Sequence, residues 1–110
     1  MRTMIKCGAL AIVLLGGVSV MAADAKENWD KECAKCHGAD GRGQTKMGRQ
    51  SGAKDYTDPK VQAELDDAKA VQRIKEGLKE NGKEKMKPYA DKFNDDEIKA
   101  LIAHIRAFKK

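Results

Sequence analysis

The sequence predicts an all-α protein, and three observations lead to this prediction. Apolar side chains recur at helical spacing near the C-terminus, at Ile98, Leu101, Ile102, Ile105 and Phe108. Asn94 precedes this stripe, and Glu97 lies three positions after Asn94. This spacing is close to the pattern of a capping box at a helix start. Beyond the first 22 residues, no segment alternates apolar and polar side chains in the way that a half-buried strand does.

The N-terminal residues have the layout of a secretory signal peptide. Arg2 and Lys6 are basic, residues 9–20 contain no charged side chain, and Val20-Met21-Ala22 suits a cleavage site. The apolar run is short for a membrane span, although an uncleaved anchor is the alternative. We therefore expect residues 1–22 to be a signal peptide and the protein to be exported to the periplasm.

We expect residues 23–110 to form a single small domain. The chain has 35% charged and 5% aromatic residues and a net charge of +5. The basic side chains are interleaved with acidic ones and aromatic residues are scarce, so we expect no nucleic-acid partner. A domain of this size with few large apolar side chains often needs a disulfide, a metal or another staple for stability.

Cys33-Ala34-Lys35-Cys36-His37 reads C-x-x-C-H, the attachment signature of c-type haem. Each thiol can add to a haem vinyl group, and the adjacent histidine can reach the iron as an axial ligand. Zinc sites and thiol redox pairs also use C-x-x-C. The only other cysteine and histidine are Cys7 and His104, and Cys7 would leave with the signal peptide. The motif therefore favours one covalently bound haem.

The first helix of the domain is predicted over residues 26–35. Trp29, Cys33 and Cys36 lie at positions i, i+4 and i+7, so a regular helix places them on one face. The glycines that follow end this helix. Residues 38–57 are rich in Gly, Lys, Gln and Ser without a clear period, which predicts an irregular loop that wraps a ligand.

Asp58-Pro59 resembles an N-cap followed by proline at the first helical position, and predicts a short helix. A longer helix is predicted over residues 67–80, ended by Asn81-Gly82. Residues 83–92 are predicted to be a second irregular stretch that contains Met86 and Pro88. The terminal helix then follows from Asn94.

The second axial position of a haem iron decides its chemistry, because methionine with histidine raises the potential and suits electron transfer. The methionines beyond the signal peptide are Met47 and Met86. Met86 lies in the irregular stretch before the last helix, where the backbone can bring its sulfur over the haem. Met47 and His104 are the alternatives.

The sequence resembles the class I cytochromes c, in particular the small single-haem bacterial ones. The resemblance rests on the early Cys33–His37 motif, on Ile74-Lys75-Glu76-Gly77, on the late Met-and-Pro segment and on Asp96-Glu97-Ile98. It implies N- and C-terminal helices packed together, with short helices and loops around one covalent haem c. It also implies thioethers at Cys33 and Cys36, and iron ligation by His37 and Met86.

Further residue roles follow from the same resemblance. Trp29 matches an aromatic of the first helix that packs against the terminal helix, and His104 occupies a packing position. Gly48-Arg49 lies where the family has a carbonyl that accepts the proton of the proximal histidine. Donors to the haem propionates are expected among four side chains of the first loop, namely Arg42, Arg49, Lys54 and Tyr56.

The implied function is electron transfer between periplasmic redox partners, without catalytic residues and not as an enzyme. We expect a monomer without stable membrane insertion after signal cleavage, which docks on acidic surfaces of its partners. The lysines expected around the haem edge are Lys35, Lys83, Lys85, Lys87 and Lys92. The alternatives are a haem enzyme or ligand sensor with a labile sixth ligand, and an electron-transfer subunit of a larger oxidoreductase.

Overall fold

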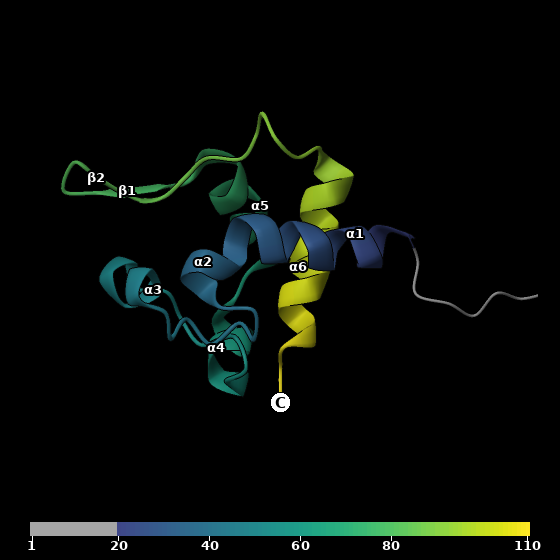
Figure 1. Ribbon diagram of the computed structural model, residues 1–110, viewed down its shortest axis with the longest axis horizontal. Helices are drawn as coiled ribbons and strands as arrows, with labels where there is room; N and C mark the ends of the chain where they lie inside the picture. Colours follow the sequence, from purple (N-terminus) through teal and green to yellow (C-terminus); the bar gives the residue numbers. More distant parts are fainter. Residues whose placement is uncertain (1–19) are drawn as a thin grey trace, which may run out of the picture.

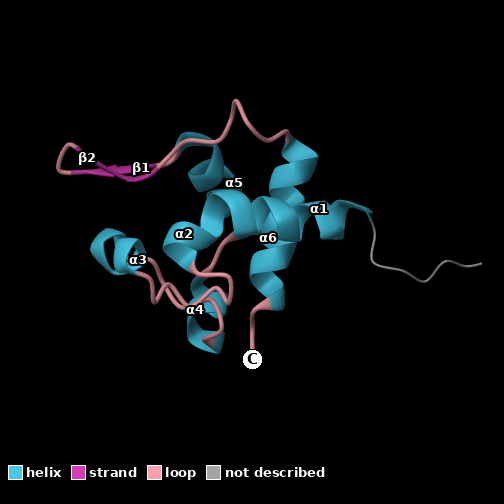
Figure 2. Ribbon diagram, viewed as in Figure 1, coloured by secondary structure: helices cyan, strands magenta, loops and turns pink. Residues whose placement is uncertain are grey.

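The computed structural model of the protein describes residues 20–110, and they fold into a mostly helical domain with one small hairpin (Figures 1 and 2). The predicted signal peptide therefore lies outside the described residues, except for its last three. Within residues 20–110, no helix is both long enough and apolar enough to span a bilayer.

The N-terminal helical segment consists of three consecutive pieces. These are α1 (Val20–Asn28), a π-helical turn η1 (Trp29–Cys33) and α2 (Ala34–His37). The segment begins earlier than predicted and ends at Gly38, whose φ of 81° closes it. The π-helical turn interrupts the regular helix that the spacing of Trp29, Cys33 and Cys36 assumed.

The C-terminal helix α6 (Asp95–Ala107) begins where the sequence predicts. The Asn94 side chain accepts a hydrogen bond from the Glu97 backbone N–H at 2.8 Å, and the Glu97 carboxylate accepts one from the Asn94 N–H at 3.0 Å. This reciprocal pair satisfies two backbone donors that a helix start would otherwise leave free.

The core of the domain lies where α6 packs against α1 and α5 (Asp67–Glu76), as Figure 1 shows. Ile98 and Leu101 of α6 are 0% and 1% exposed, and Trp29 is 2% exposed. Complete burial of such side chains stabilises the fold by about 1.5–3 kcal/mol each. The predicted contact between the N- and C-terminal helices is thereby confirmed.

Two short helices lie between the N-terminal segment and α5. The helix α3 (Lys46–Ser51) occupies part of the segment that was predicted to be an irregular loop. The helix α4 (Pro59–Glu64) begins as predicted, because the Asp58 side chain accepts from the Lys60 N–H at 2.9 Å and Pro59 follows the cap.

The prediction of a helix up to residue 80 was wrong. The helix α5 ends at Glu76, and Gly77 adopts φ 72° and ψ −165°, a conformation that is essentially restricted to glycine. An antiparallel hairpin follows, formed by β1 (Leu78–Glu80) and β2 (Lys83–Met86). Asn81 and Gly82 have φ values of 52° and 76°, as a two-residue type I′ turn requires.

Candidate haem site

The C-x-x-C-H motif lies at the end of the N-terminal helical segment. Cys33 is the last residue of η1, and Cys36 and His37 belong to α2. Both thiols are free and half-buried. Burial raises the pKa of Cys33 to about 12, with smaller contributions from Glu32 and from Cys36. Thiol redox enzymes depend on a lowered cysteine pKa, so this environment does not suit a thiol redox pair.

The loop after the motif is fixed to its backbone. The Thr45 hydroxyl donates to the Cys36 carbonyl at 2.6 Å and accepts from the Gly48 N–H at 2.8 Å. The Gly43 N–H donates to the His37 carbonyl at 2.8 Å. A Cβ atom at Gly48 would lie only 2.2 Å from the Cys36 carbonyl oxygen. The start of α3 can therefore approach the motif this closely only because residue 48 is glycine.

His37 lies between two aromatic rings. Its ring centroid is 5.5 Å from that of Trp29 and 5.6 Å from that of Tyr56, which stacks at an angle of 27°. Burial lowers the pKa of His37, so the neutral imidazole is favoured. Among the side chains of residues 20–110, its buried Nδ1 atom has no hydrogen-bond partner. A neutral imidazole is the form of histidine that ligates metals.

The family resemblance predicts that the carbonyl of Arg49, in the pair Gly48-Arg49, accepts the proton of the proximal histidine. Both residues lie within α3, and the Gly48 carbonyl accepts hydrogen bonds from the N–H groups of Gly52 and Ala53 at the end of this helix. The Nδ1 atom of His37 has no partner within residues 20–110, so the predicted hydrogen bond is not formed in this structure.

Trp29 connects the motif with the terminal helix. Its Nε1 donates to the Gly38 carbonyl at 2.9 Å in a buried hydrogen bond. The indole lies 5.2 Å from the Phe108 ring and 5.6 Å from the His104 ring, measured between centroids. Trp29 therefore packs against the C-terminal segment, as the resemblance implied. His104 also contacts Phe108 edge-on at 4.9 Å, which supports a packing role for this histidine.

Met86 ends the strand β2 opposite Leu78 and does not lie in an irregular loop. It is half-buried and packs against the core cluster, as Cys33 does. Met47, the alternative ligand, is 41% exposed on α3. Of the two methionines, Met86 is therefore the one placed against the core.

Hydrogen bonds connect the segment after Met86 to α5 and to η1. The backbone N–H groups of Tyr89 and Ala90 donate to the Ile74 and Lys75 carbonyls, at 2.9 and 3.2 Å. The Tyr89 hydroxyl donates to the Glu32 carbonyl at 3.0 Å, one residue before Cys33. Tyr89 was not predicted as a site residue, and its position three residues after Met86 is the only signal in the sequence.

The four predicted propionate donors differ in their surroundings. Tyr56 is half-buried and stacks on His37, and its partial burial raises its pKa. Arg42 is half-buried and lies 3.8 Å from Asp40, while Arg49 and Lys54 are exposed. Of these four side chains, Tyr56 is the one whose ring stacks on His37 of the motif.

One hollow of the described residues lies away from the motif. It measures about 390 Å³ and is open to solvent between α5 and β1, with Arg73 and Gly77 in its lining. Neither cysteine of the motif nor His37 borders it, and polar side chains dominate its wall. We therefore base the site on the motif and not on this hollow.

The fold and the motif together define a c-type cytochrome. A comparison with protein families matches residues 22–109 to the Cytochrome c family, and the chain belongs to this family. Members of this family typically carry electrons by means of a covalently bound haem c and are not enzymes, and this chain has the required cysteine pair at positions 33 and 36.

Solved structures give the same result. The chain is similar to the c-type cytochrome KustC0563, with a TM-score of 0.70 and 34% identity over 78% of this chain and 98% of the other. A tyrosine-to-phenylalanine mutant of Kustc0563 matches with a TM-score of 0.68 and 34% identity, over 78% of this chain and 99% of the other. A comparison with curated proteins gives no significant match.

Proposed function

We propose that this cytochrome is an exported electron carrier with one haem c, attached at Cys33 and Cys36 and ligated by His37 and Met86. The observation that carries the proposal is the half-buried His37 imidazole, whose buried Nδ1 atom has no hydrogen-bond partner within residues 20–110 and which directly follows Cys36, the second of two free cysteines. When bound, the haem supplies one-electron chemistry at its iron.

The residues around the motif fit such a group. The hydrogen bonds from Thr45 and Gly43 hold the backbone of the motif, so the two thiols and the imidazole are presented from a fixed segment. The rings of Trp29 and Tyr56 flank His37 and cover part of its surface. A carrier that keeps the same two ligands in both oxidation states undergoes little reorganisation during transfer, and this requirement favours Met86 over an open site.

Visible spectroscopy of the purified holoprotein tests the ligands. We expect a low-spin spectrum with the weak long-wavelength methionine–iron band, unchanged when carbon monoxide is added to the reduced form. Met86→Ala should abolish the band and allow carbon monoxide to bind, whereas Met47→Ala should change neither. Prompt carbon monoxide binding by the wild type would instead favour the enzyme or sensor alternative, and absence of haem would overturn the proposal.

Export and partner type are part of the same proposal. Mass spectrometry of the mature protein should show cleavage after residue 22. Purification from the native host at mild salt should give the free carrier, whereas stable co-purification with a catalytic protein would favour the subunit alternative.

We also propose that the protein docks on acidic partners through lysines near the site. Lys35, Lys83 and Lys87 are exposed. Lys85 donates to the Gln50 carbonyl at 3.3 Å, and Lys92 pairs with Glu32. Charge complementarity accelerates encounters at low salt. The transfer rate to an acidic partner should fall with ionic strength, and Lys83→Glu should lower it more than Lys60→Glu on α4. Equal effects of the two variants would remove the docking surface from the proposal.

A further inference from the structure

Gln62 of α4 is the buried polar side chain of the described core, with an exposed fraction of 4%. A buried amide is costly unless its hydrogen bonds are satisfied. Its Nε2 atom donates to two backbone carbonyls, that of Tyr56 at 2.7 Å and that of Ile105 at 2.8 Å. Gln62 therefore links the segment that carries Tyr56 to the terminal helix α6.

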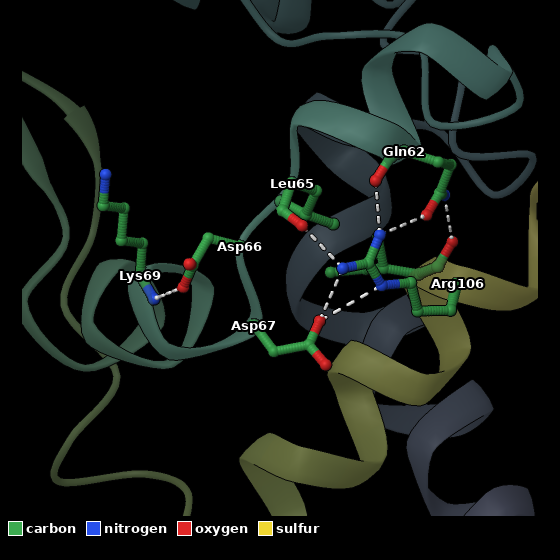
Figure 3. Close-up of polar contacts among 7 residues, drawn as sticks. Gln62, Leu65, Asp66, Asp67, Lys69 and Arg106 are labelled. Carbon is green, nitrogen blue, oxygen red and sulfur yellow. Dashed lines mark hydrogen bonds and ion pairs between the residues drawn. The ribbon is translucent and has the colours of Figure 1, made fainter.

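Arg106 of α6 fixes the orientation of this amide (Figure 3). Its Nη1 atom donates to the side-chain oxygen of Gln62 at 3.1 Å and to the Gln62 carbonyl at 2.6 Å. Its Nη2 atom donates to the Leu65 carbonyl at 2.6 Å and to the Asp67 carboxylate at 2.7 Å. With its oxygen committed to Arg106, the Gln62 amide presents its two N–H donors to Tyr56 and Ile105.

Tyr56 connects this network with the site. Its backbone N–H donates to the Gly41 carbonyl at 2.8 Å, and its carbonyl accepts from Gln62, so both sides of the residue are held. Its ring stacks on His37 with centroids 5.6 Å apart. A displacement of the Tyr56 backbone would therefore change how the ring covers the imidazole.

We propose that Gln62, oriented by Arg106, is a positioning residue that sets the reduction potential by holding Tyr56 against His37. Water near the ligand favours the oxidised, more highly charged haem, and the apolar surroundings of a metal site control access of water. Loss of the Gln62 hydrogen bonds would loosen the Tyr56 ring, admit water to His37 and lower the potential. The inference rests on the proposed ligation by His37.

The test is Gln62→Met, which nearly preserves volume and removes both donors. In voltammetry of the holoprotein, we expect the redox equilibrium to shift at least threefold toward the oxidised form, about 28 mV at 59 mV per tenfold for one electron. The matched control is Asn94→Ala, which weakens the cap of the same terminal helix without touching Gln62. It should lower stability in urea and leave the potential unchanged.

A double-mutant cycle separates positioning from general destabilisation. Tyr56→Leu should lower the potential by itself, and Gln62→Met should add no further shift in that background. If Gln62→Met does not accumulate with haem, Arg106→Lys takes its place and should shift the potential in the same direction. An unchanged potential, or a full shift that persists with Tyr56→Leu, would overturn the inference.

The outcome for the wild type keeps this inference separate from the proposed function. A wild-type protein without haem or with a high-spin spectrum contradicts the proposed ligation itself. A normal low-spin wild type whose potential does not respond to Gln62→Met contradicts only the role of Gln62.

Discussion

The terminal helix pair, α1 with α6, and the hairpin of β1 and β2 are held in opposite ways. The helix pair contributes the most deeply buried side chains, including Ile98 and Leu101. The hairpin has no fully buried residue and extends away from α1 and α6 in Figure 1. It is held by its ladder, by Met86 at one end and by the Lys85 contact with the Gln50 carbonyl.

This difference separates stability from ligand choice. The helix pair fixes the segment that bears both cysteines and His37, so its integrity determines whether the site forms at all. The proposed ligand Met86 lies at the end of the weakly held hairpin. Changes in the helix pair should therefore act on folding, whereas changes at the base of the hairpin should act on the iron.

The largest expected effect is that of Leu101→Ala in the helix pair. The side chain is 1% exposed, and truncation of a buried leucine leaves a cavity that costs about 2–5 kcal/mol. Urea unfolding of the holoprotein measures this loss. The matched control is Lys99→Ala, exposed on the same helix, which should change stability by less than about 0.5 kcal/mol. A similar small change for Leu101→Ala would contradict the assignment of the core.

Gly77→Ala at the base of the hairpin should have the next largest effect. The backbone conformation alone costs about 1–3 kcal/mol for a residue with a side chain. The new Cβ would also lie 2.4 Å from the Met86 carbonyl oxygen and 2.8 Å from the Pro88 nitrogen. We expect displacement of Met86, detected as loss of the methionine–iron band and as carbon monoxide binding.

Gly82→Ala is the matched control for Gly77→Ala. Gly82 also has a positive φ, 76°, but a Cβ there meets no atom within 4 Å. It should cost stability through the turn conformation, by about 1–2 kcal/mol, and leave the spectrum intact. Equal spectral effects of the two variants would mean that the contact with Met86 is not what matters.

Asn94→Ala should have a moderate effect on the helix pair. Loss of the cap removes the acceptor for the Glu97 N–H and should cost about 1 kcal/mol in the free energy of unfolding. Asn94→Asp keeps a good cap and should restore most of the stability. An equal loss in both variants would show that the cap contributes little.

The smallest expected effect concerns the ion pair that joins α5 to α6. Lys75 lies 2.6 Å from the Asp95 carboxylate, and its hydrogen bond and charge lower the pKa of that group. Because the folded pKa lies below the unfolded one, the stabilisation is present above about pH 4 and is lost as pH falls through the folded value. For each protein, the unfolding midpoint is measured at about pH 6 and at about pH 3. The difference between the two midpoints should be slightly smaller for Asp95→Asn than for the wild type. An identical difference would show that the pair contributes nothing.

The parts of the fold that the sequence predicts are those with local causes. The capping box of Asn94 and Glu97 and the Asp58-Pro59 start depend on neighbouring residues, and both are confirmed. The hairpin was missed because Asn81-Gly82 was interpreted as a helix stop. The same dipeptide is a strong hairpin signal, but the strands beside it, Leu78–Glu80 and Lys83–Met86, are too polar to show alternation.

For the site as well, the features with local causes are the ones that the sequence predicts. The C-x-x-C-H motif is contiguous, so its position could be predicted from the sequence. The hydrogen bonds of Tyr89 to Glu32 and of Gln62 to Ile105 join residues 57 and 43 positions apart. Such partners are chosen by the packing of α4 and α6 and of the segment after Met86, which no local pattern encodes.

The π-helical turn η1 has a consequence for how this chain can vary in length. In η1 the Ala34 N–H donates to the carbonyl of Trp29, five residues back, so the turn holds one residue more than an α-helical turn. Before this turn, α1 directs one face toward α6. After it, α2 carries Cys36 and His37 of the motif. The extra residue thus sets the angle at which the motif is presented relative to α1. Removal of a single residue from the turn would rotate the motif about the helix axis.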